Sequence, residues 1–140
     1  MEQLAMEQLG FWNVAQRNPN HLALVTPDGI EITNQELLGR SNQIVHGLRA
    51  QGFKKGDTLA TVLKNEPAIV ELYMAIAQAG FYLVPINHHL VSPEIAYIVE
   101  DCKAKAVICS EEFAEKCTKA LNGLNFNPEG RFTTGTIDNF

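Results

Sequence analysis

The sequence has few cysteines and no excess of positive charge. Its three cysteines, Cys102, Cys109 and Cys117, are an odd number without a C-x-x-C pair, which argues against a disulfide framework and favours a reducing compartment. Eleven basic residues stand against sixteen acidic ones, giving a net charge of −5, and no basic block occurs. These features argue against a nucleic-acid partner and against binding to an anionic membrane surface.

The sequence also lacks a secretory signal and an uninterrupted apolar run of membrane-spanning length. Glu2 and Glu7 interrupt the beginning of the chain, and no basic segment precedes an apolar one. The one stretch that could imitate a membrane span, residues 68–86, contains Glu71 and Pro85, which favours a buried helix followed by a buried strand. We therefore expect a cytoplasmic protein without a transmembrane segment.

The 140 residues are enough for one domain of ordinary size, and 46% of them are hydrophobic, as in globular proteins. We divide the chain into an N-terminal extension (residues 1–10), an α/β subdomain (residues 11–124) and an irregular tail (residues 125–140). The extension repeats a five-residue unit, Met1–Ala5 and Met6–Gly10, and two copies are too few for a repeat architecture.

The first third of the chain predicts a short helix, a β-hairpin and a longer helix. The helix covers residues 10–18, and Pro27-Asp28-Gly29 forms the hairpin turn between strands at 21–26 and 30–32. Thr33 is expected to cap the next helix, with Glu36 completing a capping box, and that helix ends at Gly52. Inside it, Gly39 and Gly47 suggest that another element packs closely there.

After residue 57, strands and helices alternate. Strands are predicted at 58–63, 81–86 and 104–109, and helices at 65–79, from Ser92 and from Ser110, where each serine is expected to act as N-cap. The first of these helices is apolar on most sides, and the apolar run 81–86 is typical of a strand covered on both faces. The alternation predicts an α/β fold, with a mostly parallel sheet and helices on both faces.

Ligands in such folds bind at the carboxyl ends of the strands, and the usual phosphate-binding motifs are missing. No G-x-G-x-x-G follows a strand. Gly47 and Gly52 have the glycine spacing of a P-loop, but Phe53 stands where its lysine belongs. Asn87 and His88 follow the strand 81–86, so they are candidates for the wall of a substrate pocket, with a plain surface loop as the alternative.

Other polar groups are weaker candidates. His88 and His89 point to opposite sides of an extended segment, so no metal site is expected. The segment 132–136, Phe-Thr-Thr-Gly-Thr, is weighed as an anion-binding turn against an ordinary turn or tail. Glu71 is either a polar pocket residue or part of a solvated stripe, and the cysteines are expected to be small buried side chains.

Several ordered segments resemble the start of AMP-forming acyl-CoA synthetases. The first core motif of that family reads roughly L-T-Y-x-E-L, and Ile32–Leu37 matches it with Asn34 in place of the usual tyrosine. The neighbouring matches are Pro19–Ala23, Leu48–Gly52 and Lys55–Asp57. The family belongs to the adenylate-forming superfamily, which also includes luciferases and the adenylation domains of nonribosomal-peptide synthetases.

The second core motif, an alanine-glycine pair followed by an apolar strand and a proline, is matched by Ala79–Asn87. Residues 94–98 and 101–105 resemble the segment that normally follows it. Asn87 favours the acyl-CoA synthetases, because peptide-synthetase adenylation domains usually have aspartate there. His88 and His89 depart from the proline or threonine and the arginine that often come next in acyl-CoA synthetases.

The resemblance implies that the chain is part of the large N-terminal domain of an adenylate-forming enzyme. In that reaction a carboxylic acid attacks the α-phosphate of magnesium-bound ATP, which gives an acyl-adenylate and pyrophosphate. The thiol of CoA then forms the thioester and releases AMP. The family's phosphate-binding loop, ribose-binding acid and mobile C-terminal domain lie beyond the matched part. We therefore expect no catalytic, cofactor-binding or metal-binding residue in this chain, and no activity from it alone.

Two alternatives remain at this stage. One is a stand-alone α/β binding or signalling module, although Asp57 precedes its strand and cannot serve as a receiver's phosphorylated aspartate. The other is a truncated interaction partner of a full-length synthetase. For such a short chain, apolar surface on the helix from Glu66 to Ala79, which is normally covered, predicts self-association.

Overall fold

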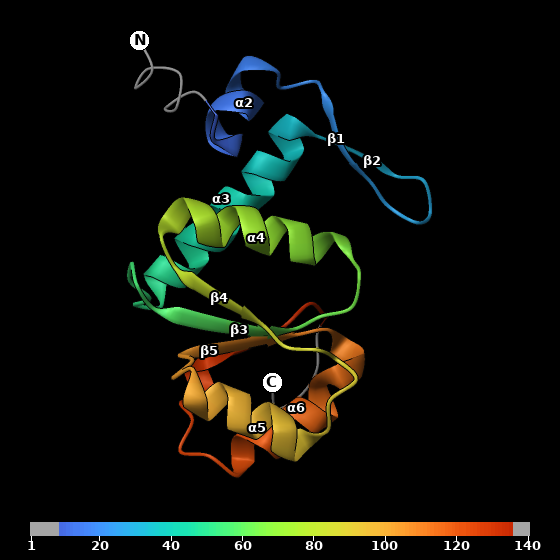
Figure 1. Ribbon diagram of the computed structural model, residues 1–140. Helices are drawn as coiled ribbons and strands as arrows, with labels where there is room; N and C mark the ends of the chain where they lie inside the picture. Colours follow the sequence, from blue (N-terminus) through green and yellow to red (C-terminus); the bar gives the residue numbers. More distant parts are fainter. Residues whose placement is uncertain (1–8, 136–140) are drawn as a thin grey trace.

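The computed structural model describes residues 9–135 (Figure 1). The α-helices are α2 (Phe11–Arg17), α3 (Asn34–Ala50), α4 (Pro67–Ala79), α5 (Ser92–Asp101) and α6 (Ala114–Asn122). Two single turns of 3-10 helix are η1 (Glu111–Phe113) and η2 (Pro128–Gly130). The strands are β1 (Leu22–Val25), β2 (Glu31–Thr33), β3 (Thr58–Val62), β4 (Tyr82–Pro85), β5 (Ala106–Cys109) and β6 (Arg131–Thr133).

Four strands form one parallel sheet in the order β4-β3-β5-β6. Figure 1 shows α3 and α4 on one face of this sheet and α5 and α6 on the other. The predicted α/β fold with a parallel sheet covered by helices on both faces is confirmed. None of the helices in residues 9–135 is long and apolar enough to cross a membrane.

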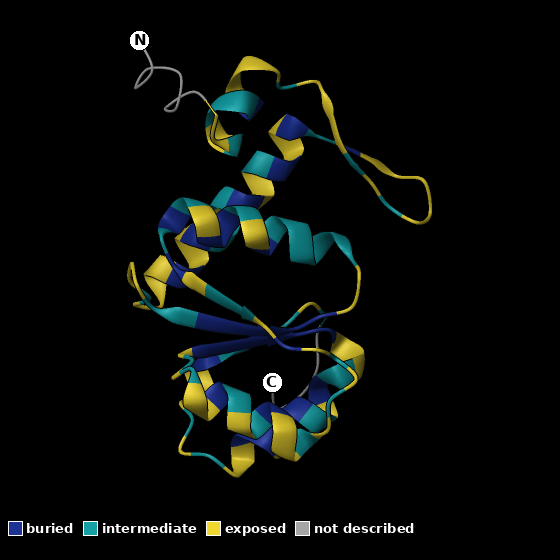
Figure 2. Ribbon diagram, viewed as in Figure 1, coloured by how far each residue is buried: buried dark blue, intermediate teal, exposed yellow. Residues whose placement is uncertain are grey.

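The core lies on both sides of the two central strands, whose side chains point alternately to opposite faces. Leu59 of β3 and Ile108 of β5 pack in the cluster beneath α3 and α4. Val62 and Val107 pack in the cluster against α5 and α6, and both are fully buried. The central strands are therefore the dark-blue centre of the molecule in Figure 2.

A two-stranded antiparallel hairpin, β1–β2, projects from the layered body (Figure 1). Its turn is closed by Gly29, whose φ of 83° suits glycine, and the Gly29 N–H donates to the carbonyl of Thr26 at 2.9 Å. The Thr26 hydroxyl also donates to the Asp28 carboxylate. The predicted hairpin and its Pro-Asp-Gly turn are thus confirmed.

Helix α3 begins with the predicted capping box. The backbone N–H of Glu36 donates to Thr33 Oγ1 at 3.3 Å, and the Thr33 N–H donates to Glu36 Oε2 at 2.8 Å. The bond from the Thr33 N–H, followed by one from the Thr33 hydroxyl to the same carboxylate at 3.1 Å, lowers the pKa of Glu36. The expectation of close packing at Gly39 and Gly47 is wrong, because a Cβ built at either position meets no heavy atom of the described residues within 4 Å apart from the adjoining backbone of α3 itself.

The strand predicted to be covered on both faces, β4, lies instead at the edge of the sheet, and Tyr82 is 66% exposed. Helix α4 buries one side, formed by Leu72, Ala75, Ile76 and Ala79, and leaves Tyr73 exposed on the other. Tyr73 and Ala77 are its exposed residues and the others are buried or half-buried, so the prediction of burial on most sides is confirmed for α4. The reason for the difference at β4 is topological: apolar composition does not specify which strand lies at the edge of a sheet.

The two serines predicted as N-caps use their hydroxyls elsewhere. Ser92 Oγ donates to the carbonyl oxygen of Lys116 at 2.8 Å, which links α5 to α6. The start of α5 is capped instead by Glu94, whose Oε2 accepts from the Val91 N–H at 2.9 Å. Ser110 Oγ donates to the Glu66 carboxylate at 2.9 Å. Both hydroxyls therefore join neighbouring elements rather than cap a helix.

The segment after residue 124, predicted to be irregular, contains η2 and β6. Strand β6 is only three residues long and pairs in parallel with β5, matching Val107 with Arg131 and Cys109 with Thr133. So short a strand has no readable alternation and forms because β5 offers a free edge. The division at residues 11–124 stays a prediction, and residues 1–8 and 136–140 lie outside the described residues.

Candidate ligand site at the carboxyl edge of the sheet

The carboxyl ends of β3, β5 and β6 meet at one edge of the sheet and surround an open hollow of about 520 Å³. We call it the acidic hollow, and its lining residues are Lys64, Glu66, Ser110, Glu111, Glu112 and Thr134. Each of them follows closely after the end of a strand. This is the edge at which open α/β sheets bind ligands.

Ser110 holds the base of the acidic hollow together. It is 1% exposed, and its hydroxyl accepts from the backbone N–H of Lys64 at 3.0 Å while donating to Glu66 Oε1 at 2.9 Å. Both capacities of this buried hydroxyl are thus satisfied. Ser110 thereby ties the loop after β3 to the end of β5 and places the Glu66 carboxylate.

The side chains that line the acidic hollow carry a net negative charge. Its one cation among the six lining residues, Lys64, pairs with Glu112 at 2.7 Å, and this contact raises the pKa of Lys64. Glu66 and Glu111 add two further carboxylates. In residues 9–135, no group of three or more His, Cys, Asp or Glu side chains is arranged to hold a metal ion. The hollow as described therefore repels anions and offers no metal cage.

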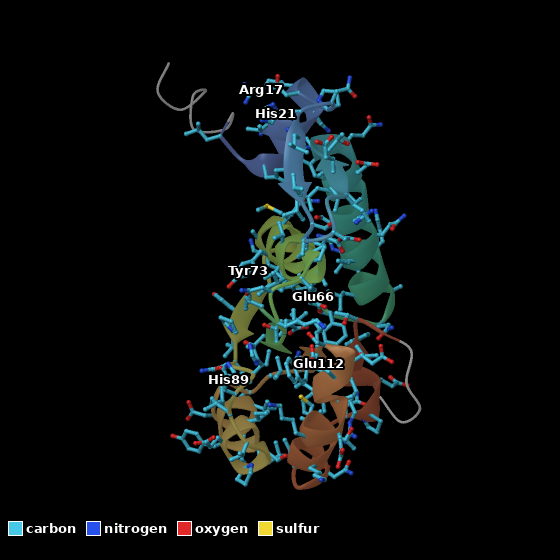
Figure 3. All side chains as sticks on the ribbon, turned by 90° about the vertical axis from the view of Figure 1, so that its right-hand side faces the viewer. Arg17, His21, Glu66, Tyr73, His89 and Glu112 are labelled. Carbon is cyan, nitrogen blue, oxygen red and sulfur yellow. The ribbon has the colours of Figure 1, made fainter. Side chains whose placement is uncertain are left out.

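Asn87 and His88 lie at the end of β4, outside the acidic hollow. Asn87 is exposed, and its Oδ1 accepts from the His89 N–H at 2.9 Å. The His88 ring stacks on Phe113 with centroids 4.8 Å apart. Figure 3 shows Glu66 and Glu112 one above the other, with His89 to the side of both. The structure thus gathers the carboxylates at the acidic hollow, whereas Asn87 and His88 are not among its lining residues.

The loop after β4 is held from α6 by one lysine. Lys116 Nζ donates to the carbonyl of His88 and, at 3.3 Å, to that of Leu90, and it lies 4.7 Å from the centre of the Phe113 ring. This arrangement makes the segment 87–90 an ordered loop. Whether Asn87 and His88 form a pocket wall stays a prediction.

The segment 132–135, which is the end of β6 and the bend after it, is an edge of the acidic hollow rather than an anion nest. The Gly135 N–H donates to Thr133 Oγ1 at 3.2 Å, and the Thr134 N–H donates to the Cys109 carbonyl at 3.0 Å. The Glu111 carboxylate lies directly against Gly135. Two N–H groups are already used and a negative charge is adjacent, which disfavours an anion. Thr136 lies outside the described residues.

The remaining candidates have structural partners. Glu71 pairs with Arg40 at 3.1 Å, between α4 and α3. Cys109 and Cys117 are fully buried, as predicted, whereas Cys102 is only half-buried. Contact with Cys117, together with burial, raises the pKa of the Cys109 thiol. A raised pKa keeps this thiol protonated and unreactive.

Sequence reasoning did not single out Glu66 or identify Ser110 as its partner. The two are 44 positions apart, and they meet because β3 and β5 are neighbours in the sheet. The available signal was a polar residue just beyond the end of each strand, at the edge where ligands bind.

Comparison with known proteins agrees with this architecture. Residues 11–133 match the family model described as AMP-binding enzyme. A feruloyl-CoA synthase of an Amycolatopsis species is 37% identical over 108 residues, which cover 76% of this chain and 22% of the relative. Tyrocidine synthase 2 of Brevibacillus parabrevis is 32% identical over 126 residues, which cover 90% of this chain and 4% of the relative.

Among solved structures, the N-terminal domain of FACL13 from Mycobacterium tuberculosis superposes with a TM-score of 0.78 and 26% identity. The match covers 89% of this chain and 32% of that domain. The chain thus spans less than a third of the length of each of these three proteins. Because the family model covers nearly all the described residues, from α2 to β6, the chain belongs to the AMP-binding enzyme family.

Proposed function

We propose that this chain forms the first α/β part of the AMP-binding domain of an acyl-CoA synthetase. Such an enzyme joins a carboxylic acid to AMP at the expense of magnesium-bound ATP, and then transfers the acyl group to the thiol of CoA. The observation that carries the proposal is the family match over residues 11–133, which includes all four strands of the parallel sheet. Its relatives include enzymes named as CoA synthases and CoA ligases.

Asn87 supports an acyl-CoA synthetase over a peptide-synthetase adenylation domain, which usually carries aspartate at that position of the resemblance. The order of the loop around it, held by Lys116, is compatible with a pocket wall at Asn87 and His88. His88 departs from the proline or threonine that often follows in acyl-CoA synthetases, and its role at a pocket wall stays a prediction.

We further propose that residues 1–140 alone do not form an acyl-adenylate. A triphosphate and a carboxylate are both anions, so their reaction needs cations and N–H donors directed at the phosphates. The described residues of the acidic hollow do not fit this need: its lysine is paired and three carboxylates surround it. No step through ATP, magnesium or CoA can therefore be assigned to these residues.

A chimera tests the proposed function. Residues 11–133 replace the matching segment of the Amycolatopsis feruloyl-CoA synthase, and formation of feruloyl-CoA from ferulate, ATP and CoA is measured. We expect a folded, active enzyme, because the segment supplies an equivalent sheet. A matched chimera carrying Leu59→Asp should not fold, since it places a charge in the core. A chimera that folds like the parent but makes no thioester contradicts the proposal.

Three further properties belong to the same proposal. Free buried thiols support a reducing, cytoplasmic location, and the net charge of −5 disfavours a nucleic-acid partner.

The exposed Tyr73 on the outer side of α4 supports self-association of the isolated chain. Light scattering of the purified chain at several concentrations tests this last point, and a monomer at every concentration contradicts it.

A further inference from the structure

We draw no further inference here: the strongest candidate, the apolar hollow of about 360 Å³ between the second half of α3, the first turns of α4 and strand β6, is an unpartnered face, and nothing in the structure shows what covers it.

Discussion

The layered body and the β1–β2 hairpin are two very different regions of this molecule. In the body, Leu59 of β3 is fully buried, with α-helices on both sides of the sheet. In the hairpin, Val25 and Ile30 are more than half exposed although they are as apolar as the core residues. Figure 2 shows the contrast directly, with a dark-blue sheet and a largely yellow arm.

The difference separates a region with its own buried core, the layered body, from one whose apolar side chains are largely exposed, the hairpin. A buried apolar side chain contributes about 1.5–3 kcal/mol relative to an exposed one, whereas an exposed apolar residue contributes little to stability. A two-stranded hairpin alone is only marginally stable in water. The body therefore accounts for the stability of the chain, and the hairpin depends on its anchor at the start of α3.

The largest expected effect tests this division of stability. Leu59→Ala should destabilise the chain by about 2–5 kcal/mol, because it removes buried methyl groups and leaves a cavity between β3 and the α3/α4 layer. Val25→Ala in the hairpin should change stability by less than about 0.5 kcal/mol. Urea unfolding followed by circular dichroism measures both. Equal losses would contradict the contrast between body and hairpin.

A glycine at the end of α4 should show the next largest effect. Gly80 has a φ of 73°, and a Cβ there would meet Lys55 Cγ at 2.9 Å. Gly80→Ala should cost at least about 1 kcal/mol, because an L-residue in the left-handed region is strained and the lysine stem must move.

Gly39→Ala is the matched control for that substitution. Gly39 lies inside α3 with open space around its Cβ position, so alanine should stabilise the chain by about 0.5–1 kcal/mol. The two glycine variants should therefore shift the thermal midpoint in opposite directions. A stabilising Gly80→Ala would show that the turn before β4 is not held as described.

The joint between hairpin and body depends on the capping box of α3. Thr33→Ala removes the hydroxyl that accepts from the Glu36 N–H and should cost about 1 kcal/mol. Thr33→Ser keeps that oxygen and should lose much less. Hydrogen exchange of the first α3 amides should rise in the alanine variant and stay near the wild-type value in the serine variant. Identical exchange in both would argue that tertiary contacts alone hold this end of α3.

The smallest expected effect is a dependence on pH at the amino end of the sheet. Asp57 accepts from Lys105 Nζ at 2.6 Å and from the Lys54 N–H at 2.7 Å, and these bonds lower its pKa below the ordinary 3.8. Its contribution is present above the unfolded pKa and is lost as pH falls through the lower folded pKa. The free energy of unfolding of Asp57→Asn should therefore decrease less steeply below pH 4 than that of the wild type. If the free energies of unfolding of the two proteins fell in parallel as the pH is lowered, a role for this carboxylate would be contradicted.

Local and periodic signals in the sequence predicted much of the fold. The capping box at Thr33, the turn at Gly29 and the alternation of strands and helices are encoded by residues close together in the chain. The failures depended on distant partners. The position of β4 at the sheet edge, the three-residue β6 and the bond from Ser92 to Lys116 follow from which elements become neighbours.

The same reason limits prediction of the site. The acidic hollow is assembled from residues after β3, β5 and β6, so Glu66 and Ser110 could be paired only once the strand order was known. Asn87 was identified from a motif that lies within one segment of the chain. A motif places a residue at the end of its own strand, but it does not show which residues of other strands surround it.

Pyrophosphate release by the purified 140-residue chain tests the central claim most directly. The chain is first shown to be folded by circular dichroism, and is then given ATP, magnesium, CoA and a panel of carboxylic acids, with the active chimera as the positive control. The account predicts no pyrophosphate above the protein-free background for any acid. Acid-dependent release that rises in proportion to the concentration of the chain, and persists through further purification, would contradict it.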